Sequence, residues 1–336
     1  MHSELIAHGT LLLSRRDVAR LLDFDTCMIA IEEALHAEAK GHVIGPAVLG
    51  MHVQNGGFHV KAASLTTQRP WFAAKCNANF PGNFARFGLP TIQGLVLLHD
   101  ASNGRVLAVM DSIEITIVRT AATTALAAKH LARTDSHTLT IVGCGSQGDA
   151  HARALCRVLP IRRVQLHDID PERANDLGTR LTTVLANVEV IAVTDVAAAL
   201  RSSDVIATCT TSDRPIVNAD DVRSGTFVAG VGADNPHKHE LAPSLFADSK
   251  IVVDHREQCA TIGDLHHALA AGAVDPAAVH ADLGEIITGK KVGRQNADEV
   301  TLFDSTGTAL QDVAAVIAIW ERASIDTTFV RFPFAS

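Results

Sequence analysis

The chain of 336 residues lacks the features that mark several special classes of protein. Its 29 lysine and arginine residues are dispersed, and its net charge is −8, which argues against a nucleic-acid partner. No apolar stretch approaches the roughly 18 residues that a membrane-spanning helix needs. The N-terminus lacks the basic flank and the small-residue cleavage site of a signal peptide. We therefore expect a cytoplasmic protein without a nucleic-acid or membrane partner.

The six cysteines contain no Cys-x-x-Cys pair, so neither a disulfide framework nor a zinc site is expected, and the thiols should be reduced and mostly buried. Two histidine clusters, at 237–240 and 266–267, lack a second cluster with ligand spacing, and we predict no metal. What is present is ample apolar material. Hydrophobic residues make up 47% of the chain and charged residues 20%, which are ordinary values for a globular protein long enough for two domains.

The most informative segment is 139–151, which reads Leu-Thr-Ile-Val-Gly-Cys-Gly-Ser-Gln-Gly-Asp-Ala-His. A strand-like apolar run leads into Gly143, Gly145 and Gly148 and then into a helix-compatible stretch. Glycines at this spacing let the backbone turn sharply, approach a pyrophosphate and pack a helix on a strand. The helix N-terminus offers unpaired N–H groups to the phosphates. The segment therefore predicts a dinucleotide site.

A second strand pattern, 163–168, ends in Asp168, about 25 residues after Gly143 and near the roughly 20 expected of a dinucleotide fold. Asp168 would accept hydrogen bonds from the ribose of the adenosine. A carboxylate there repels a 2′-phosphate, and the neighbouring Ile169 supplies no arginine to bind one. We therefore predict NAD, with NADP less favoured.

Strand and helix patterns alternate from 138 to about 255, which predicts a parallel, doubly wound sheet. The strand patterns are 139–143, 163–168, 188–193, 204–209, 226–231 and 250–254. The first third instead predicts an α+β domain with a mainly antiparallel sheet. Its patterns are a helix over 14–41 with Ser14 as its cap and strands at 57–61, 71–75, 94–99 and 105–110. Further helices are predicted at 120–132 and 309–323, and the last of these either returns to the first domain or lies at the edge of the second.

Three cations in the first third are candidates for binding a carboxylate. Lys75 lies in an apolar strand pattern, where a lysine must reach solvent, pair with an acid or meet an anionic ligand. Lys61 has a similar setting, and Arg119 carries the planar fork that suits bidentate capture of a carboxylate. Each cation alone could form an ordinary salt bridge. Together they indicate a substrate that bears a carboxylate.

Asp234 is a candidate general acid and base. It follows a strand pattern in a glycine-rich loop, residues 230–236, at the end of the sheet where open α/β folds bind ligands. The alternative is a turn or a helix cap, a common role for Asp before Asn-Pro. Near a substrate amine and an apolar nicotinamide, its pKa would be raised and it could move the proton that accompanies hydride transfer.

Several motifs occur along the chain in a fixed order: Phe80-Pro81-Gly82-Asn83, Gly88-Leu89-Pro90-Thr91, Arg119-Thr120-Ala121-Ala122, Gly143-Cys144-Gly145-Ser146-Gln147, Gly232-Ala233-Asp234 with Lys238, and Phe303-Asp304-Ser305-Thr306-Gly307 running into Gln311-Asp312. This set covers most of the chain and resembles the ornithine cyclodeaminase/mu-crystallin family. The resemblance implies a homodimer. It also implies an α/β fold in which a Rossmann-type NAD-binding domain (121–307) is inserted in a substrate-binding and dimerisation domain (1–120 and 308–336).

The resemblance assigns roles to matching residues. Lys75 and Arg119 would bind the substrate carboxylate, with Lys75 also catalytic, and Asp234 would be the proton shuttle. The positions implied around the cofactor are Thr91, Arg119, Gly143, Gly145, Ser146, Gln147, Gly148, Asp168, Thr210, Val231, Lys238 and Ser305.

The departures from the family pattern bear on the reaction. Family members usually carry an arginine at the position of Val48, and ornithine cyclodeaminases a glutamate at the position of His59. We hypothesise that Lys61 replaces the missing arginine, and we include His59 among the substrate-binding residues. Loss of the glutamate removes a partner for a distal ammonium group, which weakens the case for ornithine.

The favoured interpretation is an NAD(P)H-dependent reductase or dehydrogenase acting on the C–N bond of an α-amino acid or a cyclic imino acid. Expected substrates are 1-pyrroline-2-carboxylate, its six-membered homologue, or the imine of alanine. The alternative is an ornithine cyclodeaminase, which converts L-ornithine to L-proline and ammonia with catalytic NAD. A third hypothesis is a binding protein that uses the cofactor fold without turnover.

Overall fold

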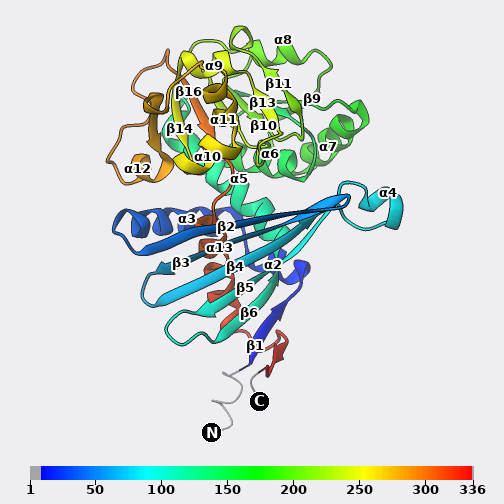
Figure 1. Cartoon of the computed structure of the whole chain (residues 1–336). Helices are drawn as coiled ribbons and strands as arrows, with labels where there is room; N and C mark the ends of the chain where they lie inside the picture. The colour runs from blue at the N-terminus through cyan, green and yellow to red at the C-terminus, as the bar shows by residue number, and fades with distance from the viewer. Residues whose placement is uncertain (1–8, 335–336) are drawn as a thin grey trace. The chain divides into compact units, whose positions relative to one another are not determined.

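A computed structural model describes residues 9–334, which form two compact units (Figure 1). The first unit contains the described residues up to Arg119 and those from Thr308 onward, and the second contains Thr120–Gly307. The elements of the first unit are β1 (Thr10–Leu13), α2 (Arg15–Leu21), α3 (Phe24–Ala39), β2 (Val43–Val53), β3 (Gly56–Thr66), β4 (Pro70–Asn79), α4 (Asn83–Phe87), β5 (Ile92–Asp100), β6 (Val106–Asp111), α13 (Ala309–Ser324) and β17 (Arg331–Phe332).

The first unit is built on one seven-stranded sheet with the order β17-β1-β6-β5-β4-β3-β2. Its pairs are antiparallel except β1 with β6, so the predicted mainly antiparallel sheet is confirmed. Helix α13 packs on β3 and β4 and against α3 (Figure 1). Successive residues of a strand face opposite sides of the sheet, so every second side chain of β3 and β4 faces these helices. Leu65, Trp71 and Ala73 are on that side and are buried.

The single helix predicted over 14–41 is wrong, because the segment forms the two helices α2 and α3. Ser14 caps α2 as predicted, in a capping box with Asp17. Asp23 then accepts a hydrogen bond from the Thr26 N–H at 2.8 Å and starts α3. A short acidic side chain between two apolar runs was a start signal for a new helix.

The boundary at Arg119 falls inside α5 (Ser112–Leu131), which begins earlier than the helix predicted from Thr120. The other elements of the second unit are β7 (Thr138–Val142), α6 (Ser146–Val158), β8 (Arg163–His167), α7 (Pro171–Val184), β9 (Glu189–Ala192), α8 (Val196–Arg201), β10 (Val205–Thr208), β11 (Asp213–Val217), η1 (Ala219–Asp221), β12 (Phe227–Gly230), β13 (His239–Leu241), α9 (Pro243–Ala247), β14 (Ser249–Val253), α10 (Arg256–Ile262), α11 (Asp264–Ala270), η2 (Pro276–Ala278), β15 (Val279–Asp282), α12 (Leu283–Ile287) and β16 (Val300–Asp304).

The second unit contains the predicted parallel, doubly wound sheet, and the predicted fold class is confirmed. Its order is β15-β14-β16-β12-β10-β7-β8-β9, with every pair parallel. The chain proceeds from β7 to β8 and β9 on one side and resumes with β10 on the other, so the switch in direction lies at the carboxyl end of β7, where ligands bind such sheets. Strands β15 and β16 were not predicted. They extend the sheet beyond β12.

All six cysteines are free, and Cys27, Cys144 and Cys259 are buried. Within residues 9–334, no helix is both long and apolar enough to cross a membrane. The same residues contain no cluster of three or more histidine, cysteine or acidic side chains that could hold a metal ion.

Candidate functional site

The glycine turn of the second unit joins β7 to α6, and Gly145 is the N-cap of that helix. Gly143 has a φ of +98°, and a Cβ added to it would lie 2.7 Å from the Cys209 carbonyl oxygen. A Cβ on Gly148 would lie 2.1 Å from the Gly143 carbonyl oxygen, so the helix packs on the turn only because residue 148 is glycine. Around Gly145 nothing lies within 4 Å of an added Cβ. The turn is therefore closed toward the protein and open at the start of the helix.

Asp168 follows β8 directly and is tied to this turn. Its Oδ2 accepts a hydrogen bond from the Cys144 N–H at 2.8 Å, and its Oδ1 accepts one from the Asp170 N–H at 3.0 Å. An ionised carboxylate has about four acceptor positions, so Asp168 can still receive hydroxyl donors. Ile169 beside it is almost fully exposed.

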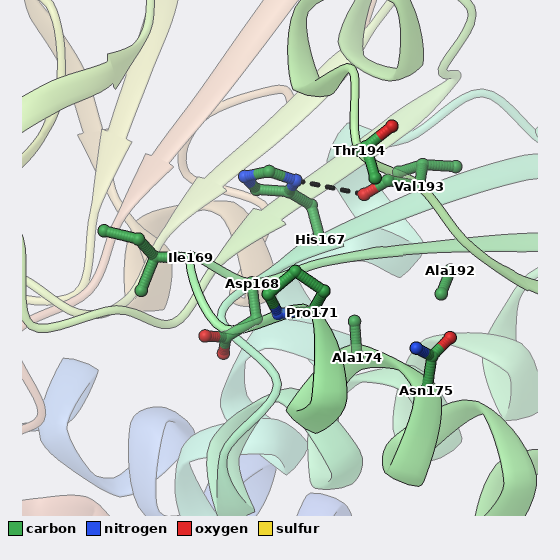
Figure 2. A pocket seen from close by; sticks show the side chains of 9 residues that line it. All are labelled: His167, Asp168, Ile169, Pro171, Ala174, Asn175, Ala192, Val193 and Thr194. Carbon is green, nitrogen blue, oxygen red and sulfur yellow. Dashed lines mark hydrogen bonds between the residues drawn. The ribbon is translucent and has the colours of Figure 1, made fainter.

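A pocket of about 330 Å³ lies next to Asp168, at the ends of β8 and β9 and the start of α7 (Figure 2). In this pocket the His167 Nδ1 and the Val193 carbonyl oxygen are 3.1 Å apart, which joins the two strand ends. Its lining residues are His167, Asp168, Ile169, Pro171, Ala174, Asn175, Ala192, Val193 and Thr194.

The loop after β12 carries Asp234. Its Oδ1 lies 2.7 Å from the Lys238 Nζ, and the Asp234 side chain is 55% exposed. Lys238 therefore contacts the predicted proton shuttle directly. Ser305, predicted near the cofactor, is buried, and its hydroxyl donates to Asp254 Oδ2 at 3.2 Å.

In the first unit, the sheet register brings the predicted cations together. Lys61 of β3 is paired directly with Lys75 of β4 on one side and with Val48 of β2 on the other. Directly opposed residues share a face of the sheet. His59, two residues before Lys61, lies on the same face and is partly buried. Val48, where the family carries an arginine, is thus the cross-strand neighbour of Lys61.

Lys75 and Arg119 meet at Asp312 of α13. The Lys75 Nζ lies 2.7 Å from Asp312 Oδ2, and the Arg119 Nε lies 3.0 Å from Asp312 Oδ1. The Arg119 Nη1 also donates to Gln311 Oε1 at 2.8 Å. Lys75, Arg119 and Asp312 are each 5% exposed or less. Two of the three predicted cations, Lys75 and Arg119, therefore form a buried network with one acid.

This network has clear electrostatic consequences. Burial, with a smaller contribution from the positive charges of Arg119 and Lys61, lowers the pKa of Lys75 to about 8 against the opposing effect of Asp312. Burial alone would raise the pKa of the Asp312 carboxyl, but the Lys75 and Arg119 cations outweigh that effect and hold it below its ordinary value. The positive charge of Lys61 also lowers the pKa of Asp312, so Lys61 acts on the same network.

The predicted residues thus fall into two groups. Lys61, Lys75, Arg119 and His59 lie in the first unit, as does Thr91, whose carbonyl accepts a hydrogen bond from the Phe80 N–H at 2.8 Å. The remaining predicted positions belong to the second unit: Gly143, Gly145, Ser146, Gln147, Gly148, Asp168, Thr210, Val231, Asp234, Lys238 and Ser305.

Two buried acids that contact the predicted site residues, Asp312 and Glu240, were not singled out from the sequence. Asp312 lies on the buried side of α13, followed by Val313 and Val316, and an acid in such an apolar pattern was the signal that a buried cation pairs with it. Glu240 was read only as part of a histidine-rich run. In the structure it is fully buried and accepts hydrogen bonds from the Thr210 and Gly232 N–H groups, both at 2.6 Å.

Comparison with known proteins decides the family. The profile of the ornithine cyclodeaminase/mu-crystallin family matches residues 8–326. This chain belongs to that family. The family resemblance inferred from the sequence motifs is therefore confirmed.

Three similar proteins illustrate the range of this family. An alanine dehydrogenase of Archaeoglobus fulgidus is 35% identical over 314 residues, which cover 94% of this chain and 95% of that protein. A solved archaeal alanine dehydrogenase dimer with bound NAD has a TM-score of 0.92 at 34% identity, covering 97% of this chain and 99% of the other. The Δ1-pyrroline-2-carboxylate reductase of Thermococcus litoralis, solved with NADH and L-proline, has a TM-score of 0.91 at 30% identity, covering 96% of this chain and all of the other.

Proposed function

We propose that this family member is an NAD-dependent reductase or dehydrogenase acting on the C–N bond of an α-amino acid or a cyclic imino acid. The similarity to enzymes that carry the names of two such activities supports the reaction class. The observation that carries the proposal is the buried Lys75–Arg119–Asp312 network with Lys61 beside it. A cluster with more positive than negative charge suits a ligand that brings a carboxylate.

The residues of the second unit fit NAD. The open side of Gly145 at the start of α6 leaves room for a pyrophosphate against backbone N–H groups. Asp168 retains acceptor capacity for ribose hydroxyls, and the adjacent pocket of about 330 Å³ suits part of the adenosine. When bound, the reduced cofactor supplies a hydride. The carboxylate of Asp168 disfavours a 2′-phosphate, so NADP is the poorer ligand.

The chain's own residues then have separate tasks. Arg119 and Lys75 bind the substrate carboxylate, and Asp312 holds both cations in place before the substrate arrives. Asp234 gives the substrate nitrogen its proton in the direction of imine reduction and takes it back in the direction of amine oxidation. The Lys238 ammonium, 2.7 Å away, stabilises Asp234 after it has lost that proton. Holding the reactants in place removes an entropic barrier of up to about 7–11 kcal/mol.

The charges on the sheet face that carries Lys61 favour a reductase over a cyclodeaminase. A diamino acid needs an anionic partner for its distal ammonium group, but His59 stands where the cyclodeaminases carry glutamate, and Lys61 adds a positive charge to the same face. Asp312 is already engaged by Lys75 and Arg119. This arrangement disfavours a substrate with a second cationic group.

The test follows NADH absorbance with the purified full-length protein. We expect stoichiometric NADH oxidation with 1-pyrroline-2-carboxylate or with pyruvate plus ammonia, and no proline from L-ornithine. Formation of proline and ammonia from ornithine with catalytic NAD and no net NADH would show that the protein is the cyclodeaminase instead. An Asp234→Asn variant that consumes NADH as fast as wild type would remove Asp234 from the mechanism. Wild-type protein that binds NADH but turns over none of these compounds would favour the binding role.

The proposed role of Lys61 in binding the substrate carboxylate is tested by transferring its positive charge to the residue paired with it on β2, Val48. Lys61→Met should raise the KM for the imino acid by tenfold or more, because one cation near the carboxylate is lost. The double variant Val48→Arg with Lys61→Met restores the usual family pattern on the facing strand and should recover most of that loss. A Lys61→Met variant with an unchanged KM would show that this lysine does not take the role of the missing arginine.

We also propose that the protein is a homodimer formed through the face of the first sheet that lies away from α13. This face is apolar and solvent-exposed over several strands, which is typical of an interaction surface. Its exposed apolar residues include Leu49, Met51, Phe58, Leu95 and Leu97. Light scattering should give a dimer for wild type and a monomer for Leu49→Lys with Leu95→Lys. The matched control Ile169→Lys, at an exposed apolar residue of the second unit, should remain dimeric.

A further inference from the structure

Glu240 joins two loops at the carboxyl edge of the parallel sheet. It lies in β13 and is completely buried. Its Oε1 accepts a hydrogen bond from the Thr210 N–H at 2.6 Å, and its Oε2 accepts from the Gly232 N–H at 2.6 Å and the Thr208 hydroxyl at 2.8 Å. Thr208 ends β10, and Gly232 comes two residues after the end of β12. One carboxylate therefore links the chain segments that leave two neighbouring strands.

The two loops touch at this point. A Cβ added to Gly232 would lie 2.2 Å from the Thr210 carbonyl oxygen and 2.6 Å from the Glu240 carboxyl carbon. Gly232 is therefore the residue that lets the backbone close on the carboxylate. The two N–H groups and the hydroxyl that face the Glu240 side chain all donate to its two oxygens, so the acceptor chemistry of this side chain matches the site.

Glu240 is itself held in place by a further acid. The Glu240 and Leu241 N–H groups donate to Asp264 Oδ1 at 2.8 and 3.1 Å. The Leu265 N–H in turn donates to Asp304 Oδ2 at 2.9 Å, at the end of β16. A succession of buried carboxylates, each bound to backbone donors, thus fixes Glu240 relative to the strand ends.

The linked loops carry residues of the proposed cofactor site. Thr210 and Val231 are positions at which the family resemblance places NAD, and Asp234 comes two residues after Gly232, with its N–H donating to the Gly232 carbonyl at 3.0 Å. We propose that Glu240 is a positioning residue, which holds the Thr210 loop and the Asp234 loop in the spacing that binds the cofactor. This inference rests on the proposed function.

A purely structural role is the alternative, and the chain offers a matched control for it. Asp204 is also buried, precedes β10, and accepts hydrogen bonds from the His137 and Thr138 N–H groups at 2.8 and 2.9 Å. Asp204 binds backbone N–H groups at the amino end of the strands, as Glu240 does at the carboxyl end. Only the carboxyl end is where ligands bind such sheets. Its loss should weaken the unit without touching the proposed cofactor loops.

The experiment measures the Kd of NADH by fluorescence titration, together with kcat, the KM of the imino acid and the melting temperature, all on the full-length protein. We expect Glu240→Gln to raise the NADH Kd at least tenfold, because an amide nitrogen faces a backbone donor. The KM of the imino acid should stay within about twofold of wild type. Asp204→Asn should lower the melting temperature but leave the NADH Kd within twofold.

If Glu240→Gln does not fold, Thr208→Val tests the same inference. This variant removes one of the three donors at nearly constant shape and should raise the NADH Kd two- to fivefold. An unchanged Kd in the folded variants, or an equal rise in Asp204→Asn, would overturn the inference. A wild-type protein that does not bind NADH would instead overturn the proposed function, and this inference with it.

Discussion

Asp312 should matter for folding as much as for the proposed chemistry. Its carboxylate is buried at 2% exposure between the Lys75 ammonium at 2.7 Å and the Arg119 guanidinium at 3.0 Å. Asp312→Asn keeps the shape of the side chain but removes its charge. Two buried cations then lose the negative charge of Asp312, which is the costly way to break a buried ion pair.

The size of the effect follows from that geometry. Removing one partner of a buried pair costs about 3–5 kcal/mol. The asparagine oxygen can still accept one of the two hydrogen bonds, which places the expected loss near the lower limit, about 3 kcal/mol. For a unit of this size, such a loss lowers the melting temperature by roughly 6–12 °C. Because the pKa of Asp312 is held below its ordinary value, this stabilisation is complete at neutral pH and is lost as the pH falls through that lowered pKa.

The assay can report on the first unit alone. The two tryptophans of the chain, Trp71 and Trp320, both lie in that unit with ring centroids 5.2 Å apart, so tryptophan fluorescence follows its unfolding. Asp326→Asn is the control. Its ion pair with Arg20 at 3.9 Å is exposed, and the asparagine oxygen can still accept from the Thr328 N–H as Asp326 does at 2.9 Å, so the midpoint should change little. A midpoint for Asp312→Asn equal to that of the control at pH 7 would refute the claim that Asp312 stabilises the two cations.

Three further predictions concern binding. Because burial lowers the pKa of Lys75 to about 8, the KM of an anionic substrate should rise above that pH as the ammonium loses its proton, and Lys75→Arg should move the rise to higher pH in a steady-state pH series. Asp168→Ser combined with Ile169→Arg should shift the ratio of kcat/KM for NADPH over NADH by at least tenfold, measured with both cofactors. Gly145→Ala should keep the wild-type melting temperature yet weaken NADH binding in a titration, whereas Gly148→Ala should lower the melting temperature as well, because its methyl group meets the Gly143 carbonyl.

The parts of the structure that could be predicted from sequence are those set by local pattern. The glycine turn was recognisable because the positive φ of Gly143 and the close packing of Gly148 demand glycine at those positions. Alternation of strands and helices was enough for the parallel sheet. Strand β16 was missed because it follows a long irregular segment, and the division between α2 and α3 was missed because the apolar spacing continues across Asp23.

The parts that could not be predicted depend on residues far apart in the chain. Lys61, Lys75 and Arg119 were recognised as cations with an unusual setting, but Asp312, the partner of Lys75 and Arg119, lies 193 residues beyond Arg119. Sequence spacing gives no signal for such a contact. Glu240 was missed for a related reason, since two of its three donors are backbone N–H groups, whose positions depend on the fold and not on residue type.

The register of β2, β3 and β4 explains how the family pattern can change without loss of charge at the proposed carboxylate site. Val48 and Lys61 are direct cross-strand partners, and such partners have Cβ atoms about 4.5–5.5 Å apart. A cation lost at one position and gained at the other therefore moves by about the width of one strand, a distance that a long, flexible lysine side chain can span. The position of His59 has no such compensation, because the residues paired with it, Gly50 and Asn77, are uncharged. In the proposed site, a cation for a carboxylate is therefore kept, whereas the acid that would pair with a second ammonium group is replaced by His59. This pattern supports the proposed imine reductase over an ornithine cyclodeaminase, because the cyclodeaminase must bind a diamino acid.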